Sequence, residues 1–380
     1  MKKKIMFMIN SLYGGGAEKV LQTIINNLDT SKYEITLYSM HREQIDNKCY
    51  KSKFQYKVIF DDCKSDNKFI KIFNALFNKA KGFIFNNCSS KVFYKLFIHE
   101  KYDVEIAFIE GESTKIIAGS SNKNSKKLAW VHIDLLSNPW TNFLYKDVID
   151  EKNHYEKYDK IICVSSSVKE SFIKKYKIAD NVIVLHNPFD KKDILDKSNF
   201  DCDINSNDFN MISVGRLEPQ KGYDRLINIA AKLKSDGFKF KIYILGDGSL
   251  KSSLLDAISE YELQGYVELL GFKENPYCYM KNCDLFVCSS RSEGYSTVIA
   301  EAIIIGMPIV STDCAGIREL FGKYDCGLIS KNNEEDLYQK LYGVLSDKSV
   351  LSLYSAQSKL RGKEFSLEYV MSKIEELINE

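Results

Sequence analysis

Short apolar runs recur along the chain in two series, with helical or polar stretches between them. The runs are rich in valine and isoleucine and do not alternate cleanly with polar residues, which is typical of parallel strands covered on both faces. The pattern predicts an α/β protein made of two doubly wound units in tandem. The first series is 5–9, 35–40, 104–109, 128–133, 161–164 and 182–185, and the second is 211–214, 242–245, 267–270, 285–288 and 309–311.

The boundary between the two units is expected at Asn187 and Pro188, where a polar stretch separates the two series. Proline disfavours helix for the residue before it and suits a crossing between domains. The predicted domains are therefore 1–187 and 188–364. The final segment, 365–380, has apolar residues at helical spacing and predicts an amphipathic helix.

Length and composition fit this organisation. The chain has 380 residues, enough for two domains with full cores, and 44% of them are hydrophobic. The formal net charge of +2 is close to neutral and so does not indicate nucleic-acid binding. The apolar part of the opening segment MKKKIMFMIN is too short for a signal peptide or a membrane span. The ten cysteines lack paired CxxC spacing, so we expect reduced thiols in a cytoplasmic protein.

The segment SEGYSTVIAE, from Ser292 to Glu301, places one glutamate before a small polar turn and a second inside the apolar run that follows. If the turn joins a strand to a helix, its free N–H groups suit a phosphate. Glu293 would then meet a sugar and Glu301 a ribose diol, because two hydroxyls can donate to one carboxylate. Ordinary helix capping and solvation is the alternative interpretation. The residues of the turn are Gly294, Tyr295, Ser296 and Thr297.

A second polar turn lies upstream, in the segment MISVGRLEPQKGYDRLI from Met211 to Ile227. It carries Arg216 and Lys221 between an apolar run and a predicted helix. A guanidinium and an ammonium beside a helix N-terminus form a strong clamp for a pyrophosphate, because both donate charge-assisted hydrogen bonds. The alternative is that both side chains are solvated surface cations.

Together these segments resemble the donor-binding half of the family-4 glycosyltransferases, which have the GT-B fold. The resemblance covers nearly the whole chain. It implies two Rossmann-like doubly wound domains that face each other across a cleft, with the acceptor in the first, the donor in the second, and the last helix packed back on the first. The matching stretches are GGGAEKVL at 14–21, HNPFD at 186–190, SVGRLEPQKGYDRLI at 213–227, YILGDG at 243–248 and, most specifically, 275–320.

The resemblance further implies a retaining transferase of bacterial surface glycan synthesis. It would move a hexose or N-acetylhexosamine from a nucleotide diphosphate sugar, with UDP the expected nucleotide, to a saccharide acceptor. Arg216, Lys221 and the N–H groups near Ser296 and Thr297 would stabilise the charge that develops on the leaving diphosphate. The leaving oxygen would take the acceptor's proton, so no protein base is nominated. Asp201 and Asp203 do not follow a strand as a metal-binding pair would, so we predict a reaction without metal or cofactor.

Three further contacts are expected. Gly15 and Gly16 lie in a glycine-rich loop after the first predicted strand, where the backbone can approach the donor's phosphates. The spacing GGGAEK is not the dinucleotide fingerprint, which disfavours a nicotinamide enzyme. By resemblance, His132 at a strand end contacts the transferred sugar; the alternative is a structural histidine bonded to a backbone carbonyl. The turn at Gly271 and Phe272 is expected to meet the base.

The segment from Asn67 to His99 has no acidic residue and interleaves lysines with aromatic residues. On helical segments such a mixture suits an anionic membrane surface. It suggests an acceptor linked to polyprenyl diphosphate and peripheral binding to the inner face of the cell membrane. The alternative is aromatic core residues with solvated lysines; single-stranded nucleic acid has no other support. The residues are Lys68, Lys71, Lys79, Lys81, Lys91 and Lys95, with Phe69, Phe73, Phe77, Phe83, Phe85, Phe93, Tyr94 and Phe97.

Two other functions stay open from the sequence. A sugar-nucleotide-binding subunit without transferase activity would keep the donor site, although an intact set of Arg216, Lys221 and both glutamates argues against degeneration. A nucleotide-sugar epimerase or hydrolase of the same fold would act without an acceptor. Tyr295 and Ser296 replace a leucine–proline pair common in the family, so the donor sugar stays open.

Overall fold

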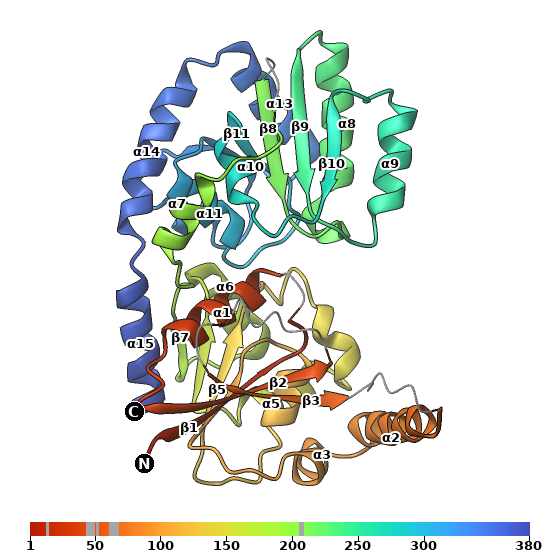
Figure 1. Cartoon of the computed structure of the whole chain (residues 1–380), viewed down its shortest axis with the longest axis vertical. Helices are drawn as coiled ribbons and strands as arrows, with labels where there is room; N and C mark the ends of the chain where they lie inside the picture. Colours follow the sequence, from red (N-terminus) through yellow and green to blue (C-terminus); the bar gives the residue numbers. More distant parts are fainter. Residues whose placement is uncertain (13–14, 43–49, 51–52, 61–67, 205–208) are drawn as a thin grey trace. The chain divides into compact units, whose positions relative to one another are not determined.

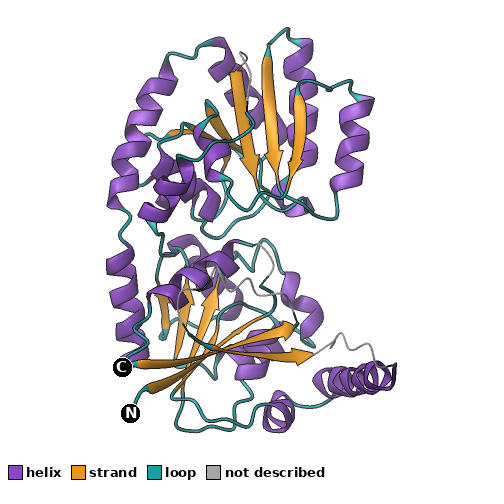
Figure 2. Ribbon diagram, in the orientation of Figure 1, coloured by secondary structure: helices purple, strands orange, loops and turns teal. Residues whose placement is uncertain are grey.

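The computed structural model describes residues 1–12, 15–42, 50, 53–60, 68–204 and 209–380. The chain divides into two compact units, each a parallel sheet with packed helices (Figure 1, Figure 2). The N-terminal unit comprises 1–188 and 368–380, and the C-terminal unit comprises 189–367. The division falls one residue beyond the boundary expected from the sequence, and nearly all of the last helix belongs to the N-terminal unit.

The N-terminal unit has a seven-stranded sheet in the order β3-β2-β1-β4-β5-β6-β7, with every pair parallel. The order reverses between β1 and β4, as in doubly wound folds. The strands are β1 (Lys3–Ile9), β2 (Tyr33–His41), β3 (Gln55–Phe60), β4 (Val104–Ala107), β5 (Lys126–Val131), β6 (Lys160–Cys163) and β7 (Val182–Val184). The helices are α1 (Gly16–Asn27), α2 (Lys68–Asn87), α3 (Ser90–Phe97), α4 (Glu112–Ile117), η1 (Trp140–Leu144), α5 (Val148–Tyr155), α6 (Ser166–Tyr176) and α15 (Leu367–Asn379).

The C-terminal unit has a six-stranded parallel sheet in the order β10-β9-β8-β11-β12-β13, which reverses between β8 and β11. Its core joins buried strand residues to the apolar face of α8. The strands are β8 (Phe209–Val214), β9 (Phe240–Leu245), β10 (Val267–Gly271), β11 (Leu285–Cys288), β12 (Ile309–Thr312) and β13 (Gly327–Ser330). The helices are α7 (Lys191–Ser198), η2 (Pro219–Lys221), α8 (Tyr223–Ser235), α9 (Lys251–Glu260), α10 (Tyr277–Lys281), α11 (Thr297–Ile305), α12 (Ile317–Phe321), α13 (Glu334–Ser346) and α14 (Val350–Glu364).

The predicted apolar runs all overlap strands of the two sheets, which confirms the α/β, doubly wound fold class. Two strands, β3 and β13, were not predicted. Each lies at the edge of its sheet. β3 is mostly half-exposed and carries Lys57 among its apolar residues, and β13 has four residues and begins at Gly327. An edge strand can bury less of its surface and lack the continuous apolar run that identifies a central strand, as β3 and β13 do, whereas the edge strands β7 and β10 keep a mostly apolar run.

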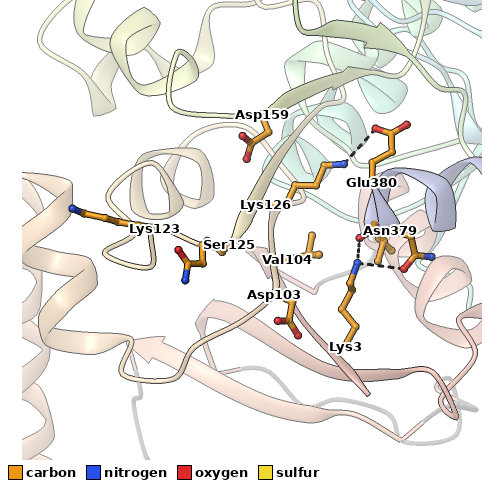
Figure 3. Close-up of a pocket in the computed structure, with 11 residues that line it drawn as sticks. Lys3, Asp103, Val104, Lys123, Ser125, Lys126, Asp159, Asn379 and Glu380 are labelled. Atoms are coloured by element: carbon orange, nitrogen blue, oxygen red, sulfur yellow. Dashed lines mark hydrogen bonds and ion pairs between the residues drawn. The ribbon is translucent and has the colours of Figure 1, made fainter. Parts of the chain in front are cut away.

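The C-terminal helix α15 is held to the amino ends of the first sheet (Figure 3). The Lys3 ammonium donates to the Ile378 carbonyl at 2.8 Å and to Asn379 Oδ1 at 3.3 Å, and Lys126 pairs with Glu380 at 3.4 Å. Cations at a helix C-terminus interact favourably with its last carbonyls. The hollow beside these residues lies at the amino ends of the strands. Doubly wound folds bind their ligands at the opposite edge, the carboxyl ends. We therefore assign the hollow to anchoring α15.

Two properties of the described part of the chain bear on its setting. No helix there is long and apolar enough to cross a bilayer. The eight cysteines found there are all free thiols, and five of them are buried.

Candidate active site

The carboxyl ends of β8 and β11 bring together the two polar turns of the C-terminal unit. These strands are neighbours in the sheet, and the strand order reverses between them. The loop after β8 carries Arg216 and Lys221, and the loop after β11 carries Glu293 and leads into α11. A crevice at such a reversal is the usual ligand site of an open α/β sheet. The fold thus places the predicted cations and the predicted helix turn at one end of one sheet.

Lys221 and Glu293 form a direct ion pair across these two loops. The Lys221 ammonium donates to Glu293 Oε1 at 2.8 Å, and the Ser290 hydroxyl donates to the same oxygen at 2.6 Å. The side chains are 17% and 8% exposed. Burial alone would lower the pKa of Lys221, but the charge of Glu293 and its hydrogen bond raise it above the ordinary value, so the ammonium stays protonated. Among the described residues nothing donates to Glu293 Oε2, which leaves that oxygen for a ligand hydroxyl.

Arg216 differs from its neighbours in having no acidic partner in the described structure. Its side chain is exposed and makes no hydrogen bond or ion pair with the described residues, whereas its carbonyl accepts from the Glu218 N–H at 2.8 Å. By contrast, Arg291 binds Asp224 through two hydrogen bonds of 2.7 and 2.6 Å, and Arg318 pairs with Asp313 at 2.7 Å. An exposed guanidinium without a carboxylate partner can donate bidentately to a phosphate.

The N-terminus of α11 lacks a side-chain cap. Ser296 stands at the N-cap position and is 3% exposed, but its buried hydroxyl makes no hydrogen bond with the described residues. At the start of α6, by contrast, the Ser165 hydroxyl accepts from the Val168 N–H at 3.2 Å. A helix N-terminus carries free N–H donors and partial positive charge. The start of α11 at Thr297 can therefore bind a phosphate, and the Ser296 hydroxyl can donate to it.

The turn before α11 is closely packed. A Cβ on Gly316, which has a φ of +75°, would lie 2.2 Å from the Gly294 carbonyl oxygen. The Tyr295 ring is 4% exposed and lies 6.4 Å from the Phe189 ring. The Tyr295 side chain therefore belongs to the interior, which leaves its backbone as the part that can meet a donor.

Glu301 lies inside α11 and is 2% exposed. The Tyr277 hydroxyl, from α10, donates to Glu301 Oε1 at 3.2 Å. The sequence predicts a role for Glu301 but carries no sign of Tyr277 as its partner, because the two residues lie on different helices.

The turn predicted for the base follows β10. Gly271 ends this strand with a φ of +71°, and the Phe272 side chain is 57% exposed. The Gly271 carbonyl accepts from the Gly246 N–H at 2.9 Å, and a Cβ on Gly246 would lie 1.9 Å from the Gly215 carbonyl oxygen. The turns after β10, β9 and β8 are therefore in contact, which connects the predicted base contact to the loop of Arg216.

In the N-terminal unit, the glycine-rich loop leads into α1. Gly15 is the N-cap and Gly16 the first helical residue, whereas Tyr13 and Gly14 of the same loop lie outside the described residues. A Cβ on Gly15 would lie 2.1 Å from Glu18 Oε2. The Glu18 carboxylate thus folds back over the α1 N-terminus, so an incoming phosphate would have to displace it.

His132 directly follows β5, and its ring is neutral. Burial lowers the pKa of His132 to about 4, partly offset by a hydrogen bond to the Phe108 backbone. Its Nε2 is buried and has no partner among the described residues. Because Nδ1 then holds the proton for Phe108, Nε2 presents a lone pair that can accept from a sugar hydroxyl. The His132 ring therefore makes the backbone hydrogen bond expected of a structural histidine and also keeps Nε2 as an acceptor for a ligand.

The low pKa of His132 predicts acid sensitivity. Between about pH 6.5 and pH 4 the unfolded chain binds a proton at this position that the folded chain does not, so stability falls as pH falls through this window. Given a folded-state pKa of about 4, His132 should account for about 2 kcal/mol of the stability lost between pH 7 and pH 5. Urea unfolding at both pH values should show a smaller loss for His132→Asn. His99→Asn, at an exposed position, is the control and should lose as much stability as the wild type. A wild-type loss in His132→Asn, or an equally reduced loss in His99→Asn, would contradict the assignment to His132.

Two glutamates that follow β4, Glu110 and Glu112, were missed. Glu110 is 2% exposed and accepts from the His132 backbone N–H at 3.0 Å and from Trp140 Nε1 at 3.4 Å. Glu112 accepts from the Asn10 amide at 2.5 Å. Burial raises the pKa of both glutamates. The stretch IEGES directly after the apolar run at 104–109 was the available signal, since polar residues after a central strand lie at the ligand-binding edge.

The basic and aromatic segment divides between core and surface. Phe85, Phe93 and Tyr94 are buried, as the core interpretation expects. Lys81 is also buried, and its ammonium donates to the Ile59 carbonyl at 2.5 Å. The side chains of Lys68, Phe69, Lys71 and Phe73 lie outside the described residues. The exposed members are Phe77, Phe83, Lys79, Lys91 and Lys95.

The fold and the similarities below define a glycosyltransferase of the GT-B type. A family model described as "Glycosyl transferases group 1" matches residues 195–361. A Campylobacter jejuni N-acetylgalactosamine-N,N'-diacetylbacillosaminyl-diphospho-undecaprenol 4-alpha-N-acetylgalactosaminyltransferase is 30% identical over 369 residues, covering 96% of each chain. The chain therefore belongs to the group 1 glycosyltransferases. A second relative, the amylovoran biosynthesis glycosyltransferase AmsD of Erwinia amylovora, is 21% identical over 99% of each chain.

Solved structures support the same fold. The structure of Anabaena HepE in complex with UDP and glucose matches 99% of each chain, with a TM-score of 0.75 and 18% identity. Staphylococcus aureus TarM matches 100% of this chain and 99% of its own, with a TM-score of 0.72 and 13% identity. At such identities the likeness establishes the GT-B fold and not the substrates.

Proposed function

We propose that this glycosyltransferase moves a hexose or N-acetylhexosamine from a UDP-sugar to a saccharide acceptor, with retention of configuration, in bacterial surface glycan synthesis. The observation that carries the proposal is the α11 N-terminus, where the buried Ser296 hydroxyl has no partner among the described residues. It lies at the carboxyl end of β11, beside the strand whose following loop holds Arg216 and Lys221. UDP in the HepE complex and the C. jejuni relative's name support the choice of substrates.

The chemistry follows from charge. When the bond between the sugar and its phosphate breaks, negative charge develops on the diphosphate. Arg216, Lys221 and the N–H groups at Thr297 are the donors that meet it. The leaving phosphate oxygen takes the proton of the acceptor hydroxyl, which forms the new glycosidic bond on the same face of the sugar. In the C-terminal unit, Glu293 Oε2 serves as an acceptor for a hydroxyl of the donor sugar; in the N-terminal unit, His132 Nε2 offers a separate acceptor for a sugar hydroxyl.

The acceptor is proposed to be a saccharide linked to polyprenyl diphosphate. The C. jejuni relative's name specifies a diphospho-undecaprenol acceptor. Phe77 and Phe83 are 47% and 66% exposed on α2, and Lys79 lies exposed between them. Exposed aromatic rings with lysines suit the headgroup region of an anionic membrane. Sedimentation with anionic vesicles should carry down the wild type and less of a Phe77→Ser/Phe83→Ser variant; equal recovery would contradict peripheral binding.

A transfer assay tests the proposed reaction. The protein, a UDP-sugar and a lipid-linked saccharide, with EDTA present, should give a longer saccharide whose new bond keeps the donor's anomeric configuration by NMR. Transfer that stops in EDTA would overturn the metal-free part of the proposal, and an inverted bond would overturn retention. Consumption of donor without elongation would favour the epimerase or hydrolase alternative, whereas donor binding without turnover would favour a binding subunit.

A further inference from the structure

The contact between Tyr277 and Glu301 connects two helices beside the proposed donor site. Glu301 lies four residues after Thr297, about 6 Å along the axis from the α11 N-terminus at ~1.5 Å per residue. A nucleoside diphosphate with its phosphates at that N-terminus would therefore have its ribose near this carboxylate. Tyr277 comes from α10, a separate helix, so it constrains Glu301 independently of α11.

The direction of this hydrogen bond is fixed by chemistry. Burial, and then the charge of Glu301, raises the pKa of Tyr277 well above its ordinary value, so the phenol keeps its proton. A carboxylate can only accept, so Tyr277 is the donor, at 3.2 Å. This hydrogen bond to Oε1 orients the Glu301 carboxylate, and its donor comes from α10 and not from α11, the helix that carries Glu301.

The position of Tyr277 is itself determined by its surroundings. Its ring is 3% exposed, and its backbone N–H donates to Asn275 Oδ1 at 3.2 Å. The Asn275 amide in turn donates to the Lys197 carbonyl of α7 at 2.9 Å. The phenol that contacts Glu301 is thus fixed by its own helix α10 and, through Asn275, by α7.

We propose that Tyr277 is a positioning residue that orients Glu301 to bind the ribose hydroxyls of the donor. The inference rests on the proposed function. The site then discriminates a ribonucleotide from a deoxyribonucleotide donor, and Tyr277 sets how strongly it does so. Tyr277 acts through Glu301 and touches no reacting atom.

The test compares UDP with 2′,3′-dideoxyuridine diphosphate by calorimetry on the full chain. The wild type should prefer UDP by about tenfold or more, as expected for hydrogen bonds to a charged group. Tyr277→Phe should reduce this preference to about threefold or less, because it weakens UDP binding and not dideoxy binding. In assays, KM for the donor should rise more than kcat falls, since ribose contacts are equal in ground and transition states.

Tyr324→Phe is the matched control. The Tyr324 hydroxyl donates to Glu364 at 2.6 Å, so the variant removes the same kind of bond elsewhere in the C-terminal unit. It should keep the wild-type preference. If Tyr277→Phe does not fold, Asn275→Ala loosens the same tyrosine from a half-buried position and should lower the preference as well.

The outcomes are separable. If the wild type binds no nucleoside diphosphate, the proposed function falls, and this inference falls with it. A wild type that binds UDP and its dideoxy analogue equally would overturn the ribose assignment alone. A preference that survives both Tyr277→Phe and Asn275→Ala would overturn the role of Tyr277 while leaving the transferase proposal intact.

Discussion

Replacing Arg216 with alanine should lower kcat/KM by about a hundred- to a thousand-fold, the usual cost of removing one preorganised donor to a developing charge. Its side chain is exposed and makes no hydrogen bond or ion pair within the described part of the chain, so its loss should leave the melting temperature nearly unchanged. Steady-state kinetics with a UDP-sugar, together with thermal unfolding, measure both quantities.

Arg216→Lys and Arg318→Ala serve as controls. A lysine keeps the charge but not the bidentate geometry, so Arg216→Lys should recover part of the activity. Arg318 is exposed and already paired with Asp313, so Arg318→Ala should stay near the wild type. Near-normal activity in Arg216→Ala would remove this residue from the proposed clamp.

Breaking the Lys221–Glu293 pair should reduce both stability and activity. Each partner is largely buried, so Lys221→Met or Glu293→Gln leaves a charge without compensation, at a cost of about 3 kcal/mol. The double variant Lys221→Met/Glu293→Gln removes both charges, so its free energy of unfolding should return toward that of the wild type. Its activity should not return, because the diphosphate still lacks the ammonium.

Urea unfolding and donor kinetics on the three variants separate the structural effect from the catalytic one. Recovery of activity in the double variant, in parallel with its stability, would show that the pair only supports the fold. If neither single variant lost stability, the pair would have to be more solvated than its exposed fractions indicate.

Much of the fold could be predicted because central parallel strands are covered on both faces. The runs of β1 and β8, for example, are continuous and apolar, and they were identified. β3 and β13 were not, because these two half-exposed edge strands lack such a run, whereas the edge strands β7 and β10 keep a mostly apolar one. The family resemblance supplied GT-B, which spacing alone could not distinguish from other tandem doubly wound folds.

The candidate site was predictable in its parts and not in its pairings. Helix-start turns, and cations between an apolar run and a helix start, leave local signals, so Arg216, Lys221 and Ser296 could be nominated. The contacts of Lys221 with Glu293 and of Tyr277 with Glu301 depend on which loops and helices the sheet brings together. The burial of Tyr295 and the neutral state of His132 likewise depend on packing around them.

Thermal unfolding of the wild type and an Arg216→Ala/Lys221→Ala variant with a panel of nucleoside diphosphates tests the donor site of the C-terminal unit. Ligand at a hundred times its dissociation constant adds about 2.7 kcal/mol of stability. UDP should stabilise the wild type without added metal, and the variant, once shown to be folded, should lose this stabilisation. A folded wild type that no nucleoside diphosphate stabilises would contradict the donor site in the C-terminal unit.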